Sequence, residues 1–219
     1  MNNDLNSIAN LKDYWKKTLI PLVSKPEATE PVFLGLLRAY AAPHRFYHNL
    51  EHLEQVLRVI EEMSFLSRNT TALLLAAWFH DFVYDSTNQD NEEKSAAEAE
   101  VCLGKLKLPI SLIKTVRELI LITKKHWPQT GDIDQYILLD ADLAIFGTAP
   151  VIYQSYLQKV RQEYAWVPIE EYRKKRQEIL QIFLDRDRIY FTDYWCNKFE
   201  AQARKNIEAE IAYLTNRAF

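Results

Sequence analysis

Glycine and proline, the residues that most often interrupt regular structure, are sparse in this chain. It has four glycines and eight prolines in 219 residues, and every proline falls between Pro21 and Pro168. Because proline ends helices and glycine weakens them, such wide spacing favours long helices. Strand signals are missing, since no alternating run of β-branched residues is bounded by turn residues. The sequence therefore predicts an all-α fold.

The hydrophobic pattern between these breakers divides the chain into segments of helical length. We expect a single helical bundle domain of nine or ten helices over residues 1–219, because no internal repeat or low-complexity linker is visible. Asp90 and Glu93 have the spacing of a capping pair, and Gly147 stands where a C-cap glycine is expected. The expected helices are Leu5–Ile20, Pro31–Ala41, Tyr47–Phe65, Thr70–Phe82, Asn91–Leu106, Pro109–Lys124, Asp134–Phe146, Pro150–Glu163, Pro168–Leu184 and Thr192–Asn216.

Composition excludes several classes of partner. The chain is 48% apolar and 26% charged, with a net charge of −3, which gives no basic footprint for nucleic acid. No apolar run approaches the roughly 18–20 residues that span a bilayer, and the N-terminus lacks a signal-peptide pattern. Cys102 and Cys196 form no CxxC pair, which favours a reducing compartment. We therefore expect a cytoplasmic protein that binds neither nucleic acid nor membrane, and the oligomeric state stays open.

Five side chains from three separate segments of the sequence are of the kinds that bind divalent metals. A helix through His48 and His52 would place both on one face, with Cβ atoms about 5–6 Å apart. His80 and Asp81 end the apolar run TALLLAAWFHD, and Asp142 lies within ILLDADLAIFG. A carboxylate among apolar residues needs a partner, and a metal is one such partner. Imidazole with carboxylate suits ions of the Mn, Fe, Co, Ni or Zn kind.

The strings around these residues resemble the HD superfamily of metal-dependent phosphohydrolases. They are most similar to a small bacterial branch of predicted hydrolases, through YHNLEH, WFHDFVYD, DNEEKSA and LLDADLAIFG, which follow in that order from Tyr47 to Gly147. The resemblance implies an HD-type bundle that holds one divalent ion, with Mn, Mg, Fe, Co, Ni and Zn as candidates. It also implies an enzyme that hydrolyses a small phosphate ester or anhydride, with nucleotides among the candidate substrates.

The resemblance implies a role for each residue of the metal motif. The second histidine of YHNxxH is the ligand in HD hydrolases, which points to His52, with His80, Asp81 and Asp142 completing four protein ligands. Asp81 would also accept a proton from the attacking water. The first histidine, His48, would donate a proton to the leaving oxygen, since histidine titrates near neutral pH. The alternative for His48 is a histidine that only forms a hydrogen bond with a ligand.

Other residues are candidates for substrate binding. Arg45 precedes His48 by three residues, and a guanidinium can hold two phosphate oxygens at once, which makes Arg45 a catalytic and binding candidate. The alternative for Arg45 is a surface salt bridge, for instance with Glu51. Further candidates are Lys94 and Arg176 for phosphate, and Tyr84 and Trp127 for stacking on a base or sugar.

Three residues are candidates to position water or to bind a second metal. They are Glu92, Glu93 and His126, although helix capping and the helix dipole account equally well for such residues. Asp142 is preferred over Asp140 because the resemblance falls on Ala141-Asp142-Leu143, and we interpret Asp140 as a helix-surface carboxylate or one that supports a ligand. Two other functions stay open: a metal-retaining ligand-binding or regulatory module without fast turnover, and a metal-dependent oxygenase, which would need a second set of ligands.

Overall fold

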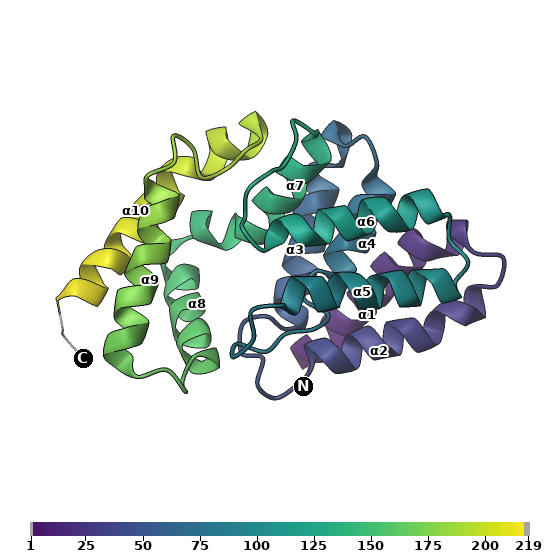
Figure 1. Ribbon diagram of the computed structural model, residues 1–219, viewed down its shortest axis with the longest axis horizontal. Coiled ribbons are helices and arrows are strands. Elements are labelled where there is room, and N and C mark those ends of the chain that lie inside the picture. The colour runs from purple at the N-terminus through teal and green to yellow at the C-terminus, as the bar shows by residue number, and fades with distance from the viewer. Residues whose placement is uncertain (1, 217–219) are drawn as a thin grey trace. The chain divides into compact units, whose positions relative to one another are not determined.

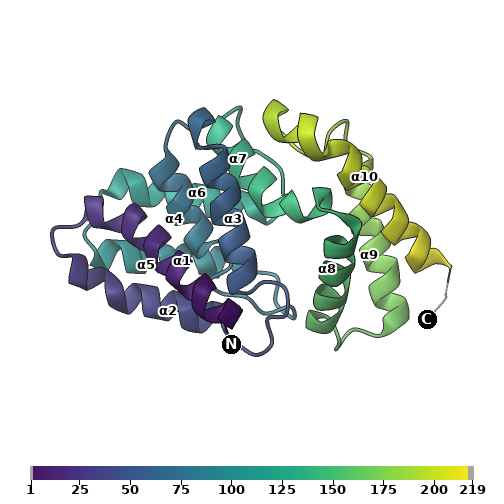
Figure 2. The same cartoon turned by 180° about the vertical axis from the view of Figure 1, so that it is seen from behind.

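The computed structural model describes the backbone of residues 2–216 and the side chains of residues 7–216 (Figures 1 and 2). Within residues 2–216 it contains ten α-helices, four short 3-10 segments and no strand, which confirms the prediction of an all-α fold with nine or ten helices. The α-helices are α1 (Asn2–Leu19), α2 (Glu30–Tyr40), α3 (Leu50–Glu62), α4 (Thr70–Phe79), α5 (Asn91–Lys105), α6 (Ile110–Thr123), α7 (Ile133–Asp142), α8 (Pro150–Glu163), α9 (Ile169–Leu184) and α10 (Asp193–Thr215). The 3-10 segments are η1 (Ile20–Leu22), η2 (Pro26–Thr29), η3 (Ser64–Leu66) and η4 (Leu143–Gly147).

The chain divides into two compact units. The first unit, Met1–Ala141, holds α1 to α6 and all but the last residue of α7, and the second unit, Asp142–Phe219, holds η4 and α8 to α10. The expectation of a single domain over residues 1–219 stays a prediction.

Helix α4 is the centre of the first unit. Seven of its ten residues are buried, and they point in all directions around the helix, which is typical of a helix that runs through a core. Helices α1, α3, α5 and α6 pack against it. Near the middle of this core the ring of Trp78 meets the ring of Trp15 edge-on at 5.1 Å between centroids, and Phe33 lies 6.1 Å from Trp78. The end of α4 is therefore held in a rigid apolar setting.

The capping bond expected at Asp90 does not form. Helix α5 begins directly after Asp90, as expected, but the Asp90 side chain makes no capping hydrogen bond. Its Oδ1 atom lies 2.8 Å from Nζ of Lys94 instead, and the other expected member, Glu93, pairs with Nζ of Lys124 at 2.5 Å. Both carboxylates are exposed and find ammonium partners, so the interpretation as a capping pair was wrong.

The second unit is built around a buried ion pair between α9 and α10. Arg176 Nε lies 2.8 Å from Glu210 Oε1, and the Glu210 side chain is only 3% exposed. Tyr153 donates to Glu210 Oε2 at 2.5 Å, and Arg176 donates to the hydroxyl of Tyr156 at 2.9 Å. Two charges and two hydroxyl groups thus satisfy one another inside the unit.

Gly147 lies where the second unit has no room for a side chain. No described glycine has positive φ, so Gly147 is not a left-handed C-cap, and that expectation was wrong. A Cβ atom at position 147 would lie 2.7 Å from Cβ of Phe199 and 2.8 Å from the hydroxyl of Tyr190. The absence of a side chain therefore lets η4 approach α10 closely.

None of the helices within residues 2–216 is by itself both long and apolar enough to cross a membrane. One bent pair, Ile133–Gly147 with Pro150–Glu163, passes by length and composition alone.

Candidate metal centre

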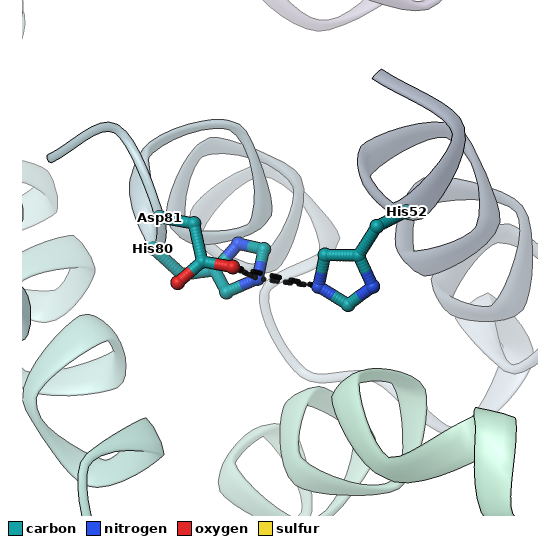
Figure 3. Close-up of side chains that lie close together, drawn as sticks. All are labelled: His52, His80 and Asp81. Carbon is teal, nitrogen blue, oxygen red and sulfur yellow. Dashed lines mark hydrogen bonds and ion pairs between the residues drawn. The ribbon is translucent and has the colours of Figure 1, made fainter. Parts of the chain in front are cut away.

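Three side chains of the first unit converge on one point (Figure 3). The Nε2 atoms of His52 and His80 are 3.2 Å apart, and Asp81 Oδ2 lies 3.5 Å from the first and 3.2 Å from the second. Neighbouring ligands bound at about 2.1 Å to one ion lie roughly 3.0–3.4 Å from each other, depending on the coordination geometry. The two histidines are 3% and 1% exposed, respectively. The cluster therefore has the atoms, spacing and burial of a site that could bind a metal ion.

Asn49 determines how α3 presents His52. Its Oδ1 atom accepts hydrogen bonds from the amides of Glu51 at 2.9 Å and His52 at 3.4 Å, as a favoured N-cap residue does. Helix α3 therefore begins at Leu50, and His52 stands in its first turn. The expected helix through both His48 and His52 was wrong, because Asn49 starts the helix after His48.

His48 nevertheless lies beside the cluster. Its ring stacks on the ring of Tyr84, with centroids 4.2 Å apart and planes 25° apart, and its centroid is 5.6 Å from that of His52. The turn before α3 thus brings His48 close to His52 without a shared helical face. The role of His48 as a proton donor stays a prediction.

The end of α4 points His80 and Asp81 at the same place. Successive residues of a continuous helix diverge by about 100° around its axis, so neighbours on a helix rarely share a site. Here α4 ends at Phe79. His80 Nδ1 is 2.8 Å from the carbonyl oxygen of Ala77, which can only accept, so Nδ1 carries the proton. When the ring of His80 is neutral, its lone pair is therefore on Nε2, the atom that faces His52 and Asp81, and when the ring is protonated this atom can donate to Asp81.

Tyr40, at the end of α2, is a site residue that sequence reasoning missed. Its side chain is fully buried, and its hydroxyl donates to the carbonyl oxygen of Trp78 and accepts from the amide of Asp81, both at 3.3 Å. Burial raises the pKa of Tyr40 to about 12, so the hydroxyl keeps its proton at neutral pH. The only signal in the sequence was that a tyrosine in a core needs a polar partner.

Arg45 joins the two segments that carry the cluster. Its guanidinium donates to the carbonyl oxygens of His48 at 3.3 Å, Asp81 at 2.5 Å and Phe82 at 2.8 Å. The residue is 7% exposed, so it does not lie at the surface, and the alternative of a salt bridge with Glu51 stays open. A further role of Arg45 in phosphate binding stays a prediction.

The loop after Asp81 is anchored by α5. The Ser95 hydroxyl accepts from the amide of Val83 at 3.0 Å and donates to its carbonyl at 3.2 Å. The Asn91 side chain likewise accepts from the amide of Asp85 at 3.1 Å and donates to its carbonyl at 2.9 Å. These contacts join the strings FVYD and DNEEKSA in the folded unit. Sequence reasoning noted both strings but did not assign roles to Asn91 or Ser95.

The electrostatics of the cluster centre on Asp81. Burial opposes its ionisation, but the charge of His80 and hydrogen bonds from His52 and His80 outweigh burial, and they hold the pKa of Asp81 well below its ordinary value. Glu92, in the first turn of α5, responds in the opposite way. Burial and the nearby charge of Asp81 raise the pKa of Glu92. This candidate for positioning water therefore lies close enough to the cluster for the Asp81 charge to affect its ionisation.

The remaining candidates of the first unit have other local partners or are exposed. Lys94 pairs with Asp90, and Glu93 pairs with Lys124. His126 has a φ of 45° just after α6, and Trp127 is 54% exposed. The structure does not bring Lys94 or Glu93 into the metal cluster, and the roles of His126 and Trp127 stay predictions.

Three candidates lie at or beyond the end of α7. Asp140 is fully buried in the first unit, so its interpretation as a helix-surface carboxylate was wrong. Asp142 is the last residue of α7 and the first of the second unit, and its place as the fourth ligand stays a prediction. Arg176 belongs to the ion pair with Glu210, which occupies its Nε and one terminal nitrogen.

Comparison with known proteins adds no relative. The chain matches no model of a known protein family, and searches of curated proteins and of solved structures find no match. Geometry alone therefore carries the conclusion that His52, His80 and Asp81 form a cluster that could bind a metal ion.

Proposed function

We propose that this protein is a metal-dependent hydrolase of a small phosphate ester or anhydride, related to the HD phosphohydrolases. The observation that carries the proposal is the convergence of His52, His80 and Asp81 from two helix ends of the first unit. The motif strings that suggested the family place these same three residues in the metal site. Asp142 is the fourth ligand that we propose.

The donor set fits a divalent ion. The two imidazole nitrogens are borderline ligands and the carboxylate oxygen is a hard one, a mixture that suits Mn, Fe, Co, Ni or Zn better than Mg. When His80 is neutral, its proton is on Nδ1 and its Nε2 atom is able to bind an ion, and Asp81 offers a carboxylate oxygen at the same point. When bound, such an ion supplies a Lewis acid for the phosphoryl oxygens and lowers the pKa of water.

The residues around the cluster would carry the proton transfers. We propose that His48 donates a proton to the leaving oxygen, with its ring held in place by stacking on Tyr84. Asp81 would accept a proton from the attacking water. Arg45 would keep the His48 and Asp81 segments together through its bonds to their carbonyl oxygens.

A substrate screen tests this function. The protein is stripped of metal with a chelator and then supplied separately with Mn, Mg, Fe, Co, Ni or Zn. Nucleotides, sugar phosphates and aryl phosphates are offered with each ion, and release of phosphate is measured. We expect turnover that depends on one or a few of these ions and that is lost again on chelation. Metal binding without phosphate release from any compound would contradict the proposal.

A ligand-binding or regulatory module is the second candidate, and one observation favours it. The cationic side chains that were expected to hold phosphate are engaged by protein groups: Lys94 by Asp90, Arg176 by Glu210 and Arg45 by carbonyl oxygens. Such a module would be stabilised against heat by a ligand that it does not turn over, which the same compounds can reveal. The oxygenase alternative gains no support, because the described side chains form one such cluster and not two.

A further inference from the structure

The hydroxyl of Tyr40 is inserted at the point where α4 ends. In a continuing helix the amide of Asp81 would donate to the carbonyl oxygen of Ala77, and the carbonyl oxygen of Trp78 would accept from the amide four residues later. In this structure His80 Nδ1 donates to Ala77, while the amide of Asp81 and the carbonyl of Trp78 both bond to Tyr40 at 3.3 Å.

This exchange of partners has a consequence for the side chains of His80 and Asp81. The next amide, that of Phe82, donates to the carbonyl oxygen of Phe79 at 3.1 Å, so the chain closes in a tighter turn. His80 and Asp81 leave the regular helix at this turn, and their Nε2 and Oδ2 atoms come within 3.2 Å of each other. One hydroxyl group from α2 therefore supports the break on which the adjacency of two ligands depends.

We propose that Tyr40 is a positioning residue of the metal site, which holds the Asp81 backbone so that its carboxylate meets the Nε2 atoms of His80 and His52. This inference rests on the metal site in the proposed function, but it does not depend on which reaction that site supports. Residues that do not touch the metal but hold its ligands in place commonly contribute about 10–100-fold to metal affinity. They do so because they keep the ligand atoms within about 0.5 Å of the positions that binding requires. Arg45 supports the same segment, and its guanidinium lies 5.1 Å from the centre of the Tyr40 ring.

The variant Tyr40→Phe tests the proposal, because it keeps the buried ring and removes only the hydroxyl. Affinity for Co²⁺ is measured by calorimetry, and the visible absorption of the bound Co²⁺ reports the geometry of its ligands. We expect about 10–100-fold weaker binding and an altered spectrum. The matched control is Tyr153→Phe, since Tyr153 is also buried and its hydroxyl also donates to a protein oxygen, Oε2 of Glu210 in the second unit. The control should bind Co²⁺ as the wild type does.

Four outcomes decide the matter. Equal Co²⁺ affinity and spectrum in Tyr40→Phe and wild type would overturn the proposal, and so would an equal loss in Tyr153→Phe. Wild-type protein that binds no divalent ion would overturn both the positioning role and the metal site. A selective loss of affinity in Tyr40→Phe without turnover of any phosphate compound would uphold the positioning role and remove only the hydrolase.

A second measurement does not depend on the variant. The amide of Asp81 should exchange slowly with solvent in the wild-type protein, because it is bonded to the buried Tyr40 hydroxyl. Exchange of that amide at the rate of an unprotected one would also overturn the proposal.

Discussion

Both units of this protein bury charged groups, but they do so in different ways. In the second unit the opposite charges of Arg176 and Glu210 lie 2.8 Å apart, and the hydroxyls of Tyr153 and Tyr156 complete the network. Burial opposes the Arg176 charge, yet Tyr156 and Glu210 hold the pKa of Arg176 well above its ordinary value. This network neutralises itself.

The first unit instead brings together three groups that could each bind a metal ion. Two imidazole nitrogens and a carboxylate oxygen, from His52, His80 and Asp81, meet within 3.5 Å. A carboxylate between two imidazoles needs a proton or a cation to offset its charge. Burial of charge alone therefore does not identify a functional site. The difference lies in the kinds of group that are buried: a cation with its anion in the second unit, and three potential metal ligands in the first.

The largest effect should come from removing the carboxylate from the cluster of His52, His80 and Asp81. Asp81→Ala should lose most of its bound metal and its metal-dependent turnover, because a ligand is lost from the ion itself. Elemental analysis of the purified protein measures the metal content. Asp193→Ala is the control, since the Asp193 side chain is 87% exposed and pairs with Arg188 in the second unit. A folded Asp81→Ala protein with normal metal content would disprove the assignment.

The next effect concerns chemistry rather than binding. His48→Ala should keep its metal but lose roughly 10²–10⁴-fold in turnover, the usual contribution of general acid catalysis. The loss should shrink for aryl phosphates with good leaving groups, which need little protonation. Turnover against a series of leaving groups measures this trend, with His44→Ala as the control because His44 lies in the same segment and contacts the carbonyl of Tyr84. A loss equal across the series would mean that His48 is not the acid.

Changes to the Arg176–Glu210 ion pair of the second unit should alter the free energy of unfolding. Glu210→Ala should cost about 3–5 kcal/mol of unfolding free energy, because the Arg176 charge stays buried without its partner. The double variant Arg176→Met with Glu210→Met should recover much of that loss, since neither charge remains. Denaturant unfolding measures both. If phosphate compounds bind the folded double variant much more weakly than the wild type, Arg176 is a substrate residue, and the contrast between the two units fails.

The smallest effect compares two capping residues of the first unit. Asn49→Ala and Asn69→Ala should each lose about 0.5–2 kcal/mol of stability, because each removes the N-cap of a helix. Only Asn49→Ala should also weaken Co²⁺ binding, since Asn49 bonds to the amide of His52. Denaturant unfolding and calorimetry separate the two effects. Equal Co²⁺ affinity in both variants would show that the cap stabilises α3 without orienting His52.

Much of the helical layout could be predicted from local sequence. The run TALLLAAWF predicts a buried helix, and α4 runs through the core of the first unit, because apolar residues on every face leave no side for solvent. The errors fall at helix ends. The extension of α3 back to Tyr47 overlooked Asn49 as a cap, and the pairing of Asp90 with Glu93 ignored the competition of Lys94 and Lys124 for the same carboxylates.

The candidate site was foreseen as a set of residues and not as an arrangement. His52, His80 and Asp81 were named from their motifs, and they do converge. Tyr40 was missed because its contacts reach 38 and 41 residues along the chain, to Trp78 and Asp81. The hydrogen bonds from Arg45 to three carbonyl oxygens could not be predicted either. Every residue has a carbonyl oxygen, so the sequence does not indicate which ones a side chain will meet.

The sequence by itself determined the helical class and which side chains can bind a metal, because helix periodicity and ligand chemistry are properties of short segments and of residue types. Only the tertiary structure decided where α4 ends, which nitrogen of His80 carries its proton, and which buried charges are paired. The end of α4 and the pairing of the buried charges depend on hydrogen bonds between segments that lie far apart in the chain. The hydroxyl of Tyr40 bonds to the amide of Asp81 only after α2 has packed beside α4, whereas the bond from His80 to the carbonyl of Ala77 forms within the end of α4 itself.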